Sequence, residues 1–430
     1  MIKGLFMKKN SVLILLLLIL SSLNINSQVI DSVLNKIITK SIDVSPKLRA
    51  LRYKQNISES KIAQVSNLSD PMLTFGLMSL PINSFEFDEE PMSGKILGIS
   101  QSVPFPGKLS AAVDVQSKDV GINQQEIDDA TNEIVNDISK MYYDLRFIRE
   151  SIRIAEENKT ILEKIAEVVR IKYSVSKASQ QNLIQIELEL TRIKDKLADL
   201  RGKEKSNVAG LNNYMLRNID ENISTSVVPE IPEENITFNT LNETSKLNRP
   251  FLKGLRLAEE KSKLMEHLAE YDFYPNFNFS IQYTQRDQLK NSNMPANDFL
   301  SFMVGINLPI DYGGKKSAKV EESRLMQKMY ADQYESALQM LNKNFGVAIN
   351  NLQSLKEREK LITEGLLPQA EQSLNISLTS YQVGDIDFIN VLDAQNKLYE
   401  IETTLYNIRT MYFKELSQLE FLTGERKNNY

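Results

Sequence analysis

Apolar side chains recur at alternating steps of three and four residues along two long stretches of the chain. The first, 108–173, contains no proline and a single glycine, Gly121. The second begins after Gly314 and keeps the same spacing, with Glu359 as an interruption. This spacing is typical of the contact seam of a left-handed coiled coil, because it stays on one face of a helix. We therefore expect two very long helices, the first about 100 Å in length.

Shorter stretches with helical periodicity lie at about 30–68, 178–216, 238–271 and 386–422. Their apolar residues also fall on one face, which predicts four further amphipathic helices. Taken alone, the helical pattern fits a soluble coiled-coil rod.

Two other stretches follow a period of two, which is the repeat of a β-strand. Polar and apolar residues alternate from Asn276 to Thr284, and apolar residues occupy every even position from 300 to 308. A weaker pair precedes them, at 73–77 and 97–100, where Gln101 breaks the second pattern. We expect four strands, each with one apolar and one polar face.

The two halves of the chain repeat one pattern. The segment 98–108 superposes on 305–315 with an offset of 207, and 173–182 superposes on 381–390 with an offset of 208. Each half therefore has the order helix, strand, strand, long helix, turn, helix. We expect a first repeat at 28–217, a linker at 218–237 with a short strand near 225–228, a second repeat at 238–424 and a tail at 425–430.

The amino terminus has the features of a secretory signal peptide. Basic residues precede an unbroken apolar run, 12–20, and a polar stretch ends near Ser27. A run of nine apolar residues is too short to span a bilayer as a helix. We expect residues 1–27 to be removed and the mature protein to be exported.

Composition excludes several classes of function. The chain has 51 basic and 56 acidic residues and thus no basic excess for binding nucleic acid. It has no cysteine and one histidine, which leaves no thiol chemistry and little room for a metal site. No catalytic constellation, metal-ligand spacing or complete phosphate-binding loop is present, so we expect neither an enzyme nor a cofactor.

Four strands of about nine residues have the length of membrane-crossing β-strands. Four strands cannot stand alone in lipid, because their edges would leave backbone groups without hydrogen bonds. Other copies of the chain must complete the sheet. A soluble β-sandwich cap on a helical rod is the alternative.

Over about residues 30–424 the chain resembles the TolC-type outer-membrane efflux proteins. The most specific match is 381–395, Tyr-Gln-Val-Gly-Asp-Ile-Asp-Phe-Ile-Asn-Val-Leu-Asp-Ala-Gln, with the ending Leu422-Thr-Gly424. The segments 70–73, 90–93 and 101–108 are similar to the branch that accompanies heavy-metal pumps of the resistance–nodulation–division type. The resemblance implies a mainly α fold with a small β component: a homotrimer whose 12-stranded barrel continues as an α-helical tunnel.

The resemblance also implies roles for three groups of residues. The gate candidates at the periplasmic entrance are Tyr381, Asn390, Asp393 and Asn182; the tips expected to dock an adaptor are Val175, Ser176, Val383, Gly384 and Asp385; the barrel–tunnel junction has Pro104, Gly107, Pro309 and Gly314. A threefold ring of Asp393 would favour cations. Asn390 is neutral where the family is often acidic, and Ile386 replaces a polar residue that locks the entrance in some members. An ordinary helical hairpin is the alternative for the tips, and a solvated helix face is the alternative for Asp393.

We therefore expect a passive outer-membrane channel of a tripartite efflux system, which exports substrates such as heavy-metal ions or drugs. Its expected partners are two further copies of itself, a periplasmic adaptor, an inner-membrane pump and outer-membrane lipid. The alternative is a secreted structural or adhesive coiled-coil protein without a pore.

Overall fold

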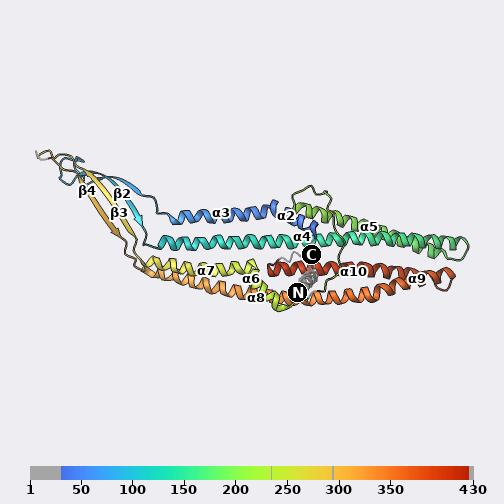
Figure 1. Ribbon diagram of the computed structural model, residues 1–430. Coiled ribbons are helices and arrows are strands. Elements are labelled where there is room, and N and C mark those ends of the chain that lie inside the picture. Colours follow the sequence, from blue (N-terminus) through green and yellow to red (C-terminus); the bar gives the residue numbers. More distant parts are fainter. Residues whose placement is uncertain (1–30, 234, 293–294, 426–430) are drawn as a thin grey trace, which may run out of the picture.

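A computed structural model describes residues 31–233, 235–292 and 295–425. The expected signal peptide, 1–27, lies outside the described residues, as does the tail after Glu425. In chain order the main elements are α2 (Ser32–Val44), α3 (Pro46–Ser66), β1 (Met72–Met78), β2 (Gly94–Val103), α4 (Lys108–Ser174), α5 (Gln180–Tyr214), α6 (Phe238–Asn248), α7 (Pro250–Glu270), β3 (Phe277–Gln285), β4 (Phe299–Ile306), α8 (Lys315–Leu361), α9 (Leu367–Val383) and α10 (Phe388–Thr423). The molecule is a long helical body with the strands at one end (Figure 1).

The strands form one antiparallel sheet in the order β1-β2-β3-β4. The β2–β3 pair joins the two halves of the chain, with Ile99 opposite Ile281 and Ser100 opposite Ser280. In this register apolar residues of β2 lie beside apolar residues of β3, and polar residues beside polar ones, so both strands point their apolar side chains to the same face. β2 continues through Gln101 to Val103 because these residues pair with β3, and the Gln101 amide donates to the carbonyl oxygen of Ser69 at 2.8 Å.

The helices pack as two rows that share α4. Towards the sheet the order of packed helices is α3-α4-α7-α8, and towards the opposite end it is α5-α4-α10-α9. The hairpin turns between α4 and α5 and between α9 and α10 form that opposite end, which we call the tip (Figure 1). The short helices α2 and α6 lie near the middle, which we call the equator.

Two expected helices are each divided by a proline. The stretch 30–68 separates into α2 and α3 at Ser45–Pro46, and 238–271 separates into α6 and α7 at Arg249–Pro250. A residue before proline is driven out of the helical conformation, and Ser45 and Arg249 accordingly have ψ angles of 116° and 114°. Both prolines then occupy the first turn of the next helix, where no backbone donor is needed.

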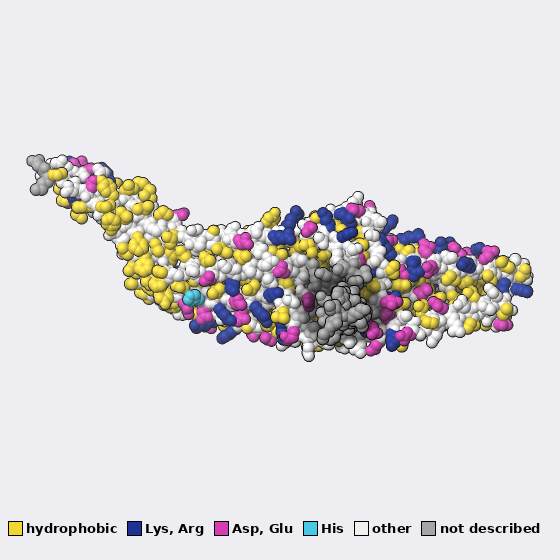
Figure 2. All heavy atoms as spheres, viewed as in Figure 1, with side chains coloured by type: hydrophobic (Ala, Val, Ile, Leu, Met, Phe, Trp, Pro, Cys, Tyr) yellow, Lys and Arg dark blue, Asp and Glu magenta, His cyan; other side chains and the backbone are white. Residues whose placement is uncertain are grey.

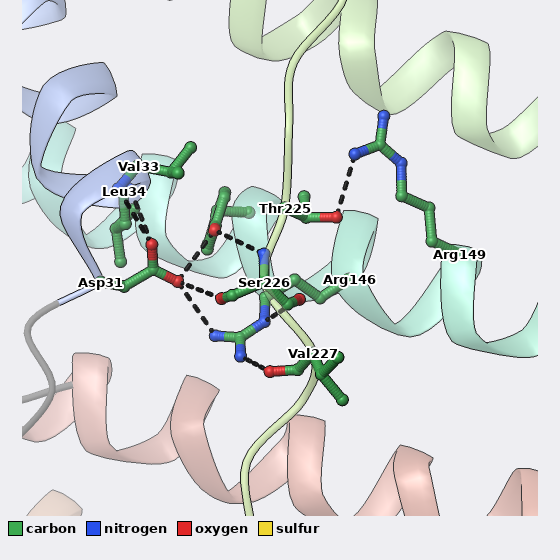
Figure 3. A network of polar contacts seen from close by, with 9 residues as sticks. Asp31, Val33, Leu34, Arg146, Arg149, Thr225, Ser226 and Val227 are labelled. Atoms are coloured by element: carbon green, nitrogen blue, oxygen red, sulfur yellow. Dashed lines mark hydrogen bonds and ion pairs between the residues drawn. The ribbon is translucent and has the colours of Figure 1, made fainter.

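The largest core lies at the equator, and a polar network holds the linker against it. Arg146 forms an ion pair of 3.4 Å with Asp31, whose other carboxylate oxygen accepts from the backbone N–H of Leu34 and caps α2 (Figure 3). Arg146 also donates to the carbonyl oxygens of Ser226 and Val227. The expectation of a strand at 225–228 is therefore wrong: the segment has no strand partner, because the α4 side chains satisfy its backbone instead.

Candidate functional site

The outer face of the sheet is apolar and uncovered. The side chains of Phe75, Ile99, Ile281 and Phe302 all lie on it, and Phe75 and Phe302 are 73% and 71% exposed. Figure 2 shows the apolar surface gathered over the strand end of the molecule, while charged side chains are spread over the helices. An uncovered apolar face of this extent marks a contact surface for lipid or protein.

The opposite face is mixed, with small and polar residues among several apolar ones. Ser100, Ser280, Gln282 and Ser301 lie on it, together with apolar side chains at Met72, Ile96, Phe299 and Met303. Within the strands the only charged residue is Lys95, the second residue of β2, which lies on the outer face opposite Leu77. Lys95 forms an ion pair of 3.2 Å with Asp287 in the adjoining loop. No helix within the described ranges is long and apolar enough to span a membrane.

The junction residues bring each second strand to the start of a long helix. Pro104 directly follows β2, where a residue without an N–H ends the ladder, and Pro309 lies three residues after the end of β4. Gly107 and Gly314 cap α4 and α8 with φ angles of 93° and 74°. A Cβ atom on Gly107 would lie 2.5 Å from the Tyr271 hydroxyl, so this turn also needs the space that glycine leaves.

One carboxylate ties the two halves together at this junction. Asp272 accepts from Lys108 of α4 and from Lys319 of α8, each at 2.7 Å. Burial favours the protonated acid, but these two hydrogen bonds lower the pKa of Asp272. The first turns of α4 and α8 are therefore held together by ion pairs to one shared carboxylate.

The two tip turns have the same backbone shape. Ser176 and Gly384, which correspond by the offset of 208, both have positive φ, at 59° and 93°. Their flanking residues Val175 and Val383 are 58% and 71% exposed, and Asp385 is exposed as well. Both turns thus expose an apolar side chain at the end of the molecule.

Tyr381 joins the second hairpin to the first. It is 6% exposed and packs on Phe388, with ring centroids 5.5 Å apart. The Lys172 ammonium of α4 donates to the Tyr381 carbonyl oxygen and lies 4.2 Å from the centre of its ring. Burial raises the pKa of the Tyr381 hydroxyl; the nearby Asn182 side chain opposes the shift, although the hydroxyl has no well-formed hydrogen bond.

The other two gate candidates lie apart from this contact. Asn390 and Asp393 are exposed on α10, and no hydrogen bond or ion pair of the described residues joins either to Tyr381 or Asn182. Asp393 pairs with Lys397 one turn further on, at 2.6 Å. Sequence reasoning missed Lys172 and Lys397. A spacing of four signals the Lys397 pair, but nothing in the sequence signals a contact between α4 and α9.

These features define a class of protein: a subunit of a membrane channel, with a lipid-facing sheet and a helical extension. The chain belongs to the outer membrane efflux protein family, whose family model matches residues 37–215 and 242–425. It is therefore an outer-membrane efflux channel and not an enzyme. Family membership decides against a secreted rod without a pore. Channels of this family are trimeric and form part of tripartite efflux systems.

Individual relatives are distant in sequence but close in fold. The cobalt-zinc-cadmium resistance protein CzcC of Cupriavidus metallidurans is 17% identical over 322 residues, which cover 74% of each chain. The structure of the outer membrane protein VceC of Vibrio cholerae superposes with a TM-score of 0.75 and 19% identity, over 92% of this chain and 97% of that chain. The structure of CusC gives a TM-score of 0.76 and 16% identity, over 94% and 96%.

Proposed function

We propose that three copies of the chain close a 12-stranded barrel, continued by a helical tunnel, and that this trimer passively exports metal cations. One observation supports the trimer: the sheet and each of the two helical rows have an unpaired element at both edges. The edge strands of the sheet are β1 and β4. The edge helices are α3 and α8 in the row towards the sheet, and α5 and α9 in the row towards the tip.

The edges are exposed and apolar along the helices as well as in the sheet. Tyr53 and Ile57 of α3 are 65% and 57% exposed, and Leu325 of α8 is 55% exposed. In the row towards the tip, Ile184 of α5 and Ile376 of α9 are 61% and 58% exposed. At every level one edge belongs to the first repeat and the other to the second. A head-to-tail ring therefore buries all three pairs of edges at once.

Metal cations are the substrate class that the sequence and the relatives favour. The segments 70–73, 90–93 and 101–108 resemble the heavy-metal branch, and CzcC is a cobalt-zinc-cadmium resistance protein. Among the described residues no group of three or more acidic or histidine side chains is placed to hold a metal ion. A conduit needs only weak, transient contact with its cargo, because tight binding would slow release.

In this proposal the two repeats, 28–217 and 238–424, form the tunnel wall, and the linker 218–237 forms the equator. An adaptor docks on the tips at 175–176 and 383–385, where exposed valines flank turns with positive φ. An inner-membrane pump supplies the energy. The entrance is closed by Tyr381 with Asn182, and Asn390 and Asp393 line the approach.

The contact between Lys172 and Tyr381 is the latch of this gate, because it links the α9–α10 hairpin to α4 close to the tip. Lys172→Met keeps the length of the side chain but removes both the hydrogen bond and the cation–π contact. We expect the variant to conduct more than the parent in planar bilayers. Lys164→Met, an exposed lysine on the same helix, is the matched control and should conduct like the parent. Equal conductance of parent and Lys172→Met would contradict the gate assignment.

A further inference from the structure

Methionine is unevenly divided between the two faces of the sheet. The strand register places Met72, Met78 and Met303 on the face opposite the apolar outer face, and we call this the inner face. The outer-face positions of the four described strands hold no methionine, and their apolar residues are leucine, isoleucine, valine and aromatic residues. A methionine sulfur is polarizable and binds soft metal ions, which those side chains do not. The methionines of the inner face are therefore candidate metal ligands.

These methionines lie on the two edge strands of the sheet. Met78 is on β1 and Met303 is on β4, and among the described residues each of these strands has one edge without a partner. In the proposed ring, β4 and α8 of one copy lie beside β1 and α3 of the next, and we call this junction the seam. The two sulfur atoms can meet only if the register of the seam brings them close.

The internal duplication supplies this register. The helices and the first strand of the second repeat follow those of the first at an offset of 204, by which Pro46 corresponds to Pro250. From the second strand onward the offset is 207, by which 98–108 corresponds to 305–315. β2 and β3, the second strand of one repeat and the first strand of the other, are partners within the chain. β4 and the β1 of the next copy are the same two kinds of strand, so they should pair in the same register.

The pairing inside the two hairpins agrees with these offsets. Thr74 and Gly98 lie opposite each other in the first hairpin. Moving them by 204 and 207 gives Asn278 and Gly305, which lie opposite each other in the second hairpin. The two hairpins thus have the same register. The same offsets, applied to the β2–β3 pairing, give the register of the seam.

In this register the apolar residues of the outer face meet across the seam. The β2–β3 pairing places Ile306 opposite Leu77 of the next copy, and Leu308 opposite its Phe75. All four side chains are exposed in a single chain, and Leu308, which lies beyond the end of β4, is 77% exposed. The seam therefore covers apolar surface that one chain leaves open.

The helices next to the sheet give a seam of the same kind. Two ion pairs, of 2.5 Å and 2.6 Å, join α4 at 118–119 to α7 at 260–261. The two offsets carry this contact to Leu325 of α8 and Ile57 of α3 in the next copy. These side chains are 55% and 57% exposed, so the predicted contact again pairs apolar residues that lack cover in one chain.

The seam brings two thioethers together on the inner face. Gly98 and Gln282 are opposite in the β2–β3 pair, so Gly305 should lie opposite Met78 of the next copy. Met303 is two residues from Gly305 on the same face, which makes it the diagonal neighbour of that Met78. Diagonal neighbours on one face of a sheet are about 7–8 Å apart, within reach of two long side chains.

The residues beside this pair are small. Met78 has Gly94 opposite it in its own chain and Gly305 on the other side, and Met303 has Ser280 opposite it. No long side chain therefore stands directly opposite either methionine in the strands described. The Ser280 hydroxyl and water can complete the contacts of an ion held between the two sulfur atoms. Two neutral sulfur ligands bind weakly enough for an ion to leave again, as a conduit requires.

We propose that Met78 and Met303 of adjacent copies form three soft-metal sites on the inner wall of the barrel, which take monovalent cations of the Cu(I) and Ag(I) type. The inference rests on the proposed function and narrows its metal cations to those that thioethers bind. Sulfur ligands favour such ions over Mg²⁺, Ca²⁺ and Mn²⁺, which prefer oxygen. No single chain contains the site, because each copy supplies one sulfur to each of two seams.

The silver ion tests the site, because it is soft and needs no reductant. In planar bilayers with potassium nitrate, we expect micromolar silver nitrate to reduce the potassium current of the parent reversibly. Met78→Leu and Met303→Leu keep an apolar side chain of similar volume but lose the sulfur, so each should be about tenfold less sensitive or more. Met72→Leu, on the same strand and face but six residues away, is the matched control and should respond like the parent. Magnesium nitrate should act alike on all four proteins.

A cysteine pair tests the register of the seam separately. The chain has no cysteine, so Leu77→Cys combined with Ile306→Cys should link neighbouring copies into disulfide-bonded trimers on oxidation. Leu77→Cys combined with Phe302→Cys, which is displaced by four residues on the same face, is the matched control. It should stay unlinked, because a disulfide cannot bridge Cα atoms more than about 7 Å apart.

The outcomes separate the site from the trimer. If linked trimers conduct potassium but silver has no effect, or has the same effect on the parent, Met78→Leu and Met303→Leu, the site is overturned and the proposed function stands. Linking of the control pair in place of the predicted pair overturns the register and the site with it. A parent that forms no conducting trimer contradicts the proposed function, and the site falls too because one chain cannot build it.

Discussion

In the proposed trimer, single charged residues near the tip set the ion selectivity of the channel. Asp393, the residue expected to form an acidic ring, carries its own counter-charge in Lys397, and both side chains are well exposed at 60% and 66%. An exposed pair of this kind is worth only about 0.3–0.5 kcal/mol to a helix. In the proposed trimer the pair should affect ions more than stability, because a threefold copy multiplies the local field.

Changes to this pair should therefore shift ion selectivity in opposite directions. Asp393→Asn leaves the lysine uncompensated and should lower the preference for cations. Lys397→Gln leaves the carboxylate uncompensated and should raise it. Reversal potentials under a salt gradient measure both, with Lys205→Gln, an exposed lysine of α5, as the control. Identical reversal potentials in all four proteins would remove Asp393 from the pore.

Glu402 on α10 makes stability depend on pH. Burial, then the charge of Glu157, raise its pKa from the ordinary 4.5, and Arg153 only partly offsets them. A carboxyl group whose pKa is higher in the folded than in the unfolded state stabilises the fold at low pH, and this contribution is lost as pH rises through the folded pKa. The parent should thus lose stability from about pH 4.5 upward.

Glu402→Gln should remove this loss, so the variant gains melting temperature relative to the parent at neutral pH but not at pH 4. Thermal unfolding in detergent across this range measures the difference. Glu400→Gln, an exposed neighbour on the same helix, is the control. A difference between Glu402→Gln and the parent that is independent of pH would refute the assignment.

Whole elements followed the sequence pattern wherever one periodicity governed a stretch. The helix expected at 108–173 is α4, and the four expected strands are β1 to β4. The errors arose where a local rule interrupts a continuing pattern. Pro46 and Pro250 divide helices whose apolar faces continue across the break, and the π turn at 362–366 preserves an apolar stripe by adding a residue. The Lys172–Tyr381 contact could not be predicted, because it depends on how two distant helices align.

The ending Thr423-Gly424 of the family signature has a structural explanation at this scale. Gly424 caps α10 with φ of 72°, and a Cβ atom there would lie 2.7 Å from both the Cα atom of Arg249 and the carbonyl oxygen of Asn248. Arg249 in turn donates to the Phe421 carbonyl oxygen and forms an ion pair of 3.1 Å with Asp129. The end of α10 is thus fitted against the joint between α6 and α7.

Gly424→Ala should therefore destabilise the protein by about 1–3 kcal/mol more than Gly314→Ala. Gly314 has a similar φ of 74° but open space where its Cβ would lie, so the comparison isolates the backbone clash. Melting temperatures of the two variants in detergent measure it. Equal melting temperatures would mean that the chain at 248–249 moves aside without cost.

The molecule as a whole is a duplicated unit whose two copies have diverged in one respect. Both halves supply two strands, a long helix and a tip, and the sheet joins them through β2 and β3. The long helix of the first half is unbroken, whereas that of the second half contains a π turn at Ile362–Leu366. The duplication was predictable from two offsets, whereas the difference between the halves required burial at each position.

The central claim is that the free edges of one chain are closed by two further copies in the outer membrane. The most direct test is the native mass of the mature protein extracted from outer membranes in mild detergent. We predict a particle of three chains that is absent from the detergent-free fraction. A monomer or dimer, or a protein released without detergent, would contradict the shared barrel and with it the tunnel and the gate.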